Sequence, residues 1–161
     1  MMMKNIFTAA VIAISLVACN NSEPASEATE HEHDHSSMPT DGGPDALYVP
    51  EGASVNFVRP QDGDTVNAKV YVQFGLTGME VRPAGEVVKG TGHHHIIIDD
   101  VATPQGTVVP ADENHIHFGG GATETELTLT PGMHTLTLQF ANGIHQSYGP
   151  QMSATINVFV K

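Results

Sequence analysis

The chain has 161 residues, with 6 Lys or Arg against 18 Asp or Glu, so its formal net charge is −12 when the histidines are neutral. So acidic a chain repels a phosphate backbone, and we expect no nucleic acid among its partners. Its length allows one ordinary domain plus a tether but excludes two large domains. Ten histidines outnumber the basic residues, and a single cysteine excludes an internal disulfide.

The first 18 residues have the features of an export signal. Lys4 provides a positive charge, and residues 6–17 form an apolar run too short to span a bilayer as a stable helix. The run ends in Leu16-Val17-Ala18-Cys19, which resembles the lipobox of bacterial lipoproteins. That resemblance implies cleavage before Cys19 and acylation of Cys19.

Acylation at Cys19 would tether the protein to a membrane without a transmembrane segment, since two lipid-modified groups suffice for stable anchoring. The protein would then work on the periplasmic side of the cell envelope. Asn20 and Asn21 follow directly, with no Asp at these positions. By resemblance to enterobacterial lipoproteins, this implies sorting to the outer membrane.

Residues 19–46 are mostly Ser, Glu, Ala, Pro, Asp, Gly and His. Such a segment buries too little apolar surface to offset the entropy of ordering, so we expect a flexible acidic tether. The alternating residues His31, His33 and His35 are separated by acidic residues. They could capture Zn²⁺ or Cu²⁺ weakly, or they could simply be solvated linker residues.

From residue 47 to 161 the sequence consists of short apolar alternations separated by Gly, Pro, Asp and Asn, with no helical period. Alternation with a period of two residues is typical of β-strands. We expect strands at residues 55–58, 70–76, 93–99, 115–118, 127–130, 134–140 and 156–160. About seven strands in this length predict an all-β domain, a Greek-key β-sandwich of the immunoglobulin or cupredoxin type.

Two His-x-His pairs stand on expected strands. Alternation places His93 and His95 on one face of their strand, and it places His115 and His117 on one face of theirs. The backbones of such a pair lie about 7 Å apart, so two imidazoles can bind one ion. The pairs therefore predict a metal site, with structural hydrogen-bonding or packing roles as the alternative.

Three further histidines have different expected roles. His94 shares its face with Ile96 and Ile98, so we expect it to pack or hydrogen-bond inside the domain. His134 is in phase with apolar residues after a turn, at a place similar to the tyrosine corner of immunoglobulin-like sandwiches, which favours a structural role. His145 is a possible additional metal ligand.

Three spaced motifs resemble a family of exported bacterial domains catalogued as domain of unknown function 4399. The motifs are residues 90–95, 115–121 and 131–136, and the resemblance extends over roughly residues 55–160. It brings no established activity. A weaker resemblance links residues 60–63, 131–135 and 143–145 to CopC-type copper-resistance proteins, which are periplasmic copper-binding sandwiches. Because Ile144 interrupts their Gly-His pair, that resemblance supports a ligand only at His145.

Together these patterns predict a lipid-anchored periplasmic module that binds copper or zinc and buffers or delivers the ion without catalysing a reaction. One alternative is a metal-free structural or protein-interaction module of the envelope with a periplasmic partner of unknown identity. A second is an enzyme of the copper-zinc superoxide dismutase kind. The cysteine pair that this second resemblance requires is absent, because Cys19 is the only cysteine.

Replacing Cys19 with Ser tests the anchoring directly. Without a thiol to acylate, the Cys19→Ser protein should move from the membrane fraction to the soluble fraction of fractionated cells. If the variant stays in the membrane fraction to the same extent as the unaltered chain, the lipoprotein interpretation is wrong.

Overall fold

The computed structural model describes residue 43 and residues 45–161. The expected signal at residues 1–18, the acylated Cys19, most of the expected tether and the histidines His31, His33 and His35 lie outside the described residues. Within the described part, no helix is both long enough and apolar enough to cross a membrane.

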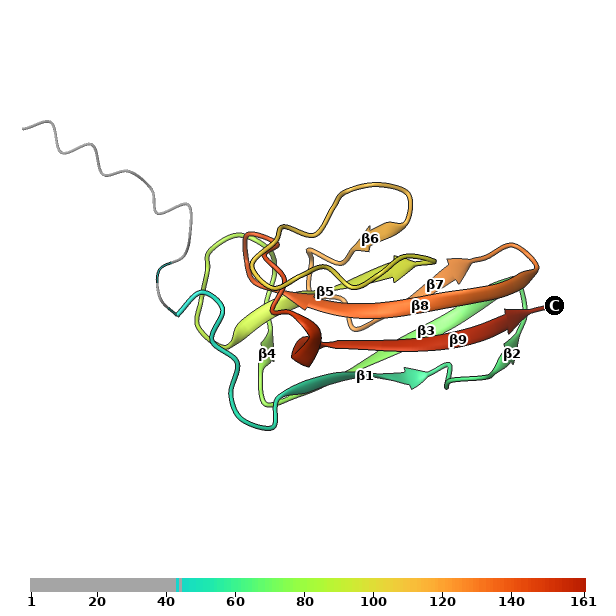
Figure 1. The fold of residues 1–161 in the computed structure, drawn as a ribbon, viewed down its shortest axis with the longest axis horizontal. Helices are drawn as coiled ribbons and strands as arrows, with labels where there is room; N and C mark the ends of the chain where they lie inside the picture. The colour runs from blue at the N-terminus through green and yellow to red at the C-terminus, as the bar shows by residue number, and fades with distance from the viewer. Residues whose placement is uncertain (1–42, 44) are drawn as a thin grey trace, which may run out of the picture. The chain divides into compact units, whose positions relative to one another are not determined.

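The domain is an all-β sandwich of two sheets with nine strands (Figure 1). The first sheet is antiparallel, in the order β1-β3-β7, and the second has the order β2-β9-β8-β5-β4, with β6 also paired to β5. The strands are β1 (Ser54–Arg59), β2 (Thr65–Val66), β3 (Lys69–Thr77), β4 (Glu80–Val81), β5 (Thr91–Ile98), β6 (His115–His117), β7 (Glu124–Thr128), β8 (Gly132–Ala141) and β9 (Ser153–Val160), and a 3₁₀ turn, η1 (Pro150–Met152), precedes β9.

The predicted all-β sandwich is confirmed, and each of the seven expected strands is present. The two additional strands, β2 and β4, have only two residues each, which is too short for an alternating pattern to be visible. The strand expected at residues 127–130 instead spans Glu124–Thr128. Asp99, expected as the last residue of its strand, lies just beyond β5 with a φ of 56°.

The hydrophobic core lies between the two sheets. Alternate residues of β3 (Val70, Val72 and Phe74) face alternate residues of β8 (Leu136, Leu138 and Phe140), and all six are buried. Burial of these apolar side chains is the main source of stability in such a fold.

The second sheet is also covered on its outer face. There the segment of residues 99–114 packs against residues 144–148: the hydroxyl of Ser147 donates to the carbonyl oxygen of Thr103 at 2.8 Å, and the amide of Val109 donates to the carbonyl oxygen of His145 at 2.9 Å. As a result, seven of the eight β5 residues are buried, whichever face they occupy. β5 is therefore covered on both faces, and it is paired to β6 on one side and to β8 on the other.

His134 connects the end of β5 to the start of β8. Its Nδ1 lies 2.7 Å from the Asp99 carboxylate, its Nε2 lies 2.8 Å from the Thr130 carbonyl oxygen, and Asp99 also accepts the Thr135 amide at 2.8 Å. Burial lowers the pKa of His134, but the Thr130 carbonyl and the Asp99 carboxylate raise it more, so its net pKa lies above the usual value. The geometry gives His134 a structural place at this corner.

Replacing His134 with Ala should lower the free energy of unfolding by about 1–2 kcal/mol at pH 5.5, because the variant loses two hydrogen bonds, one of them to a carboxylate. Since the folded-state pKa is raised, this stabilisation is fully present below pH 6.5 and is lost as the pH rises through the folded-state pKa. Urea unfolding at pH 5.5 and 9 measures the difference. Met133→Ala, at an exposed neighbouring position, is the matched control. Equal stability of His134→Ala and the unaltered protein at both pH values would contradict this role.

Candidate metal centre

Four histidine rings gather on the outer face of the second sheet. His93 and His95 come from β5, His117 comes from β6, and His145 comes from the loop after β8. All six pairs of these rings are in contact, with centroid separations from 4.7 to 5.9 Å. We call these four residues the histidine cluster.

Strand pairing brings three of the four rings together. In the antiparallel pairing of β5 with β6, His95 lies directly opposite His117, so their side chains share one face. His93 is two residues before His95 and therefore points to the same side. A Cβ atom at Gly119 would overlap the His117 imidazole, so this glycine leaves room for the ring.

The Nε2 atoms of the cluster are closer together than hydrogen bonding alone explains. Nε2 of His93 lies 3.1 Å from that of His95 and 3.2 Å from that of His117, and the His117 and His145 Nε2 atoms are 3.1 Å apart. Each neutral Nε2 carries either one hydrogen or one lone pair. Four such atoms can form at most two N–H···N bonds, so at least one of the three short contacts has no hydrogen bond.

A cation among the four nitrogens would satisfy every lone pair at once. The candidate ligand atoms of His93, His95 and His117 all lie within 4.8 Å of one another. Metal–imidazole bonds of 2.0–2.1 Å place neighbouring nitrogens about 3.3 Å apart in a tetrahedral site and about 2.9 Å apart in a square-planar one. The observed separations of 3.1 and 3.2 Å lie between these values.

Burial favours the neutral form that binds metals at His93, His95 and His117. Burial, followed by the charges of neighbouring histidines, lowers the pKa of His93 to about 4 and that of His95 to about 3. Burial and the charge of His145 also lower the pKa of His117. For a histidine that is free in water, protons compete with a metal ion near the ordinary pKa of about 6.5. The structure places that competition at lower pH for the buried members.

The Nδ1 atoms of His93 and His95 bear on whether these residues can act as metal ligands. If Nε2 binds an ion, Nδ1 carries the proton, and ligand histidines usually donate that proton to an oxygen. The Nδ1 atoms of His93 and His95 have no hydrogen-bond partner among the described residues. Gln139 lies opposite His95 in the pairing of β5 with β8, and its Oε1 is likewise buried without a partner.

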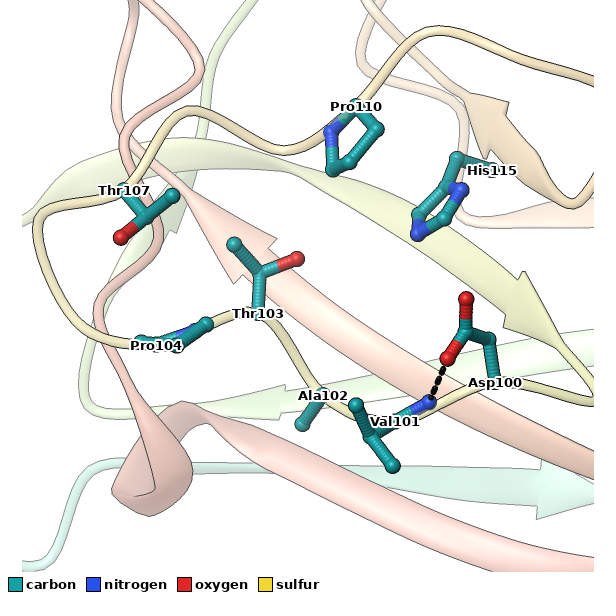
Figure 2. A pocket seen from close by; sticks show the side chains of 8 residues that line it. All are labelled: Asp100, Val101, Ala102, Thr103, Pro104, Thr107, Pro110 and His115. Atoms are coloured by element: carbon teal, nitrogen blue, oxygen red, sulfur yellow. Dashed lines mark hydrogen bonds between the residues drawn. The ribbon is translucent and has the colours of Figure 1, made fainter.

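The structure does not bring His115 to the cluster, although His115 and His117 are two residues apart. Its Nδ1 lies 2.7 Å from the Asp112 carboxylate in the preceding turn, and it pairs with Ile97 instead of His95. Its ring lines a separate pocket of about 200 Å³, where Figure 2 shows it together with Asp100 and Pro110.

His94 points to the opposite side of β5, into the core. Its ring lies 5.1 Å from that of Phe74 and 5.0 Å from that of Phe140, measured between centroids. Neither ring nitrogen has a partner among the described residues, and burial lowers the pKa of His94 to about 4. His94 is therefore a packed neutral ring that is separated from the cluster by the strand.

Residues 72–161 match the family model described as "Domain of unknown function (DUF4399)". The chain belongs to this family. The part of the chain that matches the DUF4399 model contains the whole histidine cluster. No curated protein matches the chain.

One solved structure shows a weak likeness to this DUF4399 protein, the endo-beta-1,4-mannanase from Thermotoga petrophila. The likeness has 16% identity and a TM-score of 0.39, and it covers 71% of this chain and 20% of that one. The chain thus spans about a fifth of the length of that protein. A likeness at this level says nothing about activity.

The neutral buried histidines should make the metal-free protein sensitive to acid. The unfolded chain binds protons at these sites near pH 6.5, whereas folded His93 and His94 do so only near pH 4, so stability is lost as the pH falls through this window. In a chelator-treated sample, Tm should fall by roughly 10 °C between pH 7 and pH 5. His94→Leu removes one of these sites and should flatten the dependence. A Tm independent of pH in this range would contradict the burial argument.

Proposed function

We propose that this protein is a metal-binding module of the cell envelope that holds one copper or zinc ion on the histidine cluster. The observation that supports the proposal is the set of three Nε2···Nε2 contacts of 3.1–3.2 Å among the four rings. Hydrogen bonds cannot satisfy all three contacts, whereas one ion can.

The proposed role is to buffer or deliver the ion. The space beside the cluster is a pocket of about 200 Å³ whose other lining residues are Val108, Val109, Pro110 and Ala111. These residues have no group that can act as a general acid, a general base or a nucleophile. The pocket thus supports holding and exchanging an ion better than it supports a reaction on a substrate.

Copper and zinc both suit the cluster. Imidazole nitrogen binds either ion well, and no thiolate or thioether is among the four ligands, so ligand type does not separate them. The nitrogen separations lie between tetrahedral and square-planar values, so they also admit both Zn²⁺ and Cu²⁺.

We also propose that the module is lipid-anchored through Cys19 on the periplasmic side of the envelope, at the outer membrane. The support for this part is the lipobox-like sequence at residues 16–19 and the absence of Asp after it. In that arrangement His31, His33 and His35 would offer weaker ligands on the same chain.

Metal titration of the purified full chain tests the proposal. His31, His33 and His35 are first replaced by Ala, which removes weak binding by that segment. This background protein should bind one Zn²⁺ or Cu²⁺ per chain by calorimetry and by elemental analysis. Adding His93→Ala with His117→Ala should weaken the affinity by more than about 100-fold, because loss of a ligand costs more than loss of a residue that only supports one.

His115→Ala is the matched control, since His115 lies two residues from His117 but outside the cluster. It should leave stoichiometry and affinity unchanged, and circular dichroism checks that each variant is folded. If the background protein binds neither ion, the proposal is wrong and the metal-free interaction module is favoured. Unchanged binding in His93→Ala with His117→Ala would place the site elsewhere.

A further inference from the structure

The four rings of the cluster differ in how firmly the fold holds them. His93 and His95 are 0% and 1% exposed and belong to β5, which is hydrogen-bonded to strands on both sides. His117 is exposed, but it belongs to β6, which is paired to β5, its ring lies against Gly119, and its Nε2 makes short contacts with both His93 and His145. His145 is half-buried in a loop, and its Nε2 makes its one short contact with a single member of the cluster, His117.

Hydrogen bonds hold the backbone at His145. The Asn142 side-chain oxygen accepts the amides of Ile144 and Gln146, and the His145 amide donates to the Asn142 carbonyl oxygen at 2.9 Å. His145 itself has a φ of 69°, a left-handed conformation that is uncommon outside glycine and that occurs at ligand clamps. The His145 ring can therefore leave the cluster by side-chain rotation, without movement of the loop.

The apolar pocket adjoins this part of the cluster. Its lining includes the rings of His95, His117 and His145 but not His93, which lies deeper. An ion held by the cluster would thus be approached from the pocket, on the side where His95, His117 and His145 lie. The volume of about 200 Å³ leaves room there for a second ring.

We propose that His145 is a displaceable ligand and that this pocket admits an imidazole side chain from an acceptor protein, so that the ion leaves by ligand exchange. This inference rests on the proposed function. In the exchange step the bond from the ion to His145 Nε2 breaks as a bond to the incoming nitrogen forms. Both ligands are neutral, so no charge or electron is transferred.

The surroundings favour a neutral incoming ligand over an anionic one. A carboxylate or thiolate in this pocket would lose its hydration against Val108, Val109 and Pro110. The chain is also strongly acidic, and the Asp112 carboxylate follows the pocket residue Ala111 directly. An imidazole combines an apolar ring with a neutral nitrogen donor. It therefore loses no charged-group hydration in the pocket and is not repelled by the acidic chain.

Zinc release measures the exchange directly. The full chain with His31, His33 and His35 replaced by Ala is loaded with Zn²⁺ and mixed with an excess of a chromogenic chelator, with and without added imidazole. Imidazole should accelerate release from this protein at least about tenfold, because it replaces His145. His145→Ala should still bind one Zn²⁺ but release it at least about tenfold faster without imidazole, since differences in affinity are mostly differences in dissociation rate.

Two further variants separate the pocket from general effects on the fold. Ala111→Phe narrows the pocket without removing a ligand and should suppress the acceleration by imidazole. Ala102→Phe makes the same change in the pocket at His115 and should behave like the unaltered protein. Absence of Zn²⁺ binding in the background protein would defeat the proposed function.

If Zn²⁺ binds, two results would overturn the inference alone. One is release from His145→Ala at the rate of the background protein, and the other is complete loss of binding in His145→Ala, which would make His145 an indispensable ligand. Acceleration by imidazole that persists unchanged in Ala111→Phe would exclude this pocket as the route.

Discussion

The two-residue alternation along β5 is the constraint on which the site depends. Because both faces of this strand are covered, one face places His94 between Phe74 and Phe140 in the core, and the other places His93 and His95 against His117 and His145. A shift of one residue in register would exchange these environments. The same pairing that builds the core therefore also orients the two most buried rings of the cluster.

Desolvation then determines the chemistry of the cluster. In water, four adjacent imidazoles could avoid one another by taking up protons or by turning toward solvent. Inside the domain, burial lowers the pKa of His93 and His95, so that both rings stay neutral, and their positions two residues apart on β5 place their Nε2 atoms 3.1 Å from one another. Neutral rings whose lone pairs converge are a poor hydrogen-bonding network but a suitable ligand set for one ion.

Alternation predicted most of the fold, because seven strands are long enough to show a period of two. The site was predictable only in part. His93 and His95 follow from their position on a strand, but His115 and His117 have identical spacing, and only strand register and the Asp112 side chain separate them. Asn142 fixes the loop of His145 through local hydrogen bonds, but the contacts of the His145 ring with His93 and His117 join residues far apart in the chain, which local sequence does not show.

The most direct measurement of the central claim is a crystal structure of the full chain grown with Zn²⁺, with anomalous diffraction recorded at the zinc absorption edge. The account predicts one strong anomalous peak among His93, His95, His117 and His145, about 2.0–2.1 Å from their Nε2 atoms. An ordered domain with these four rings in place and no anomalous peak among them would contradict it.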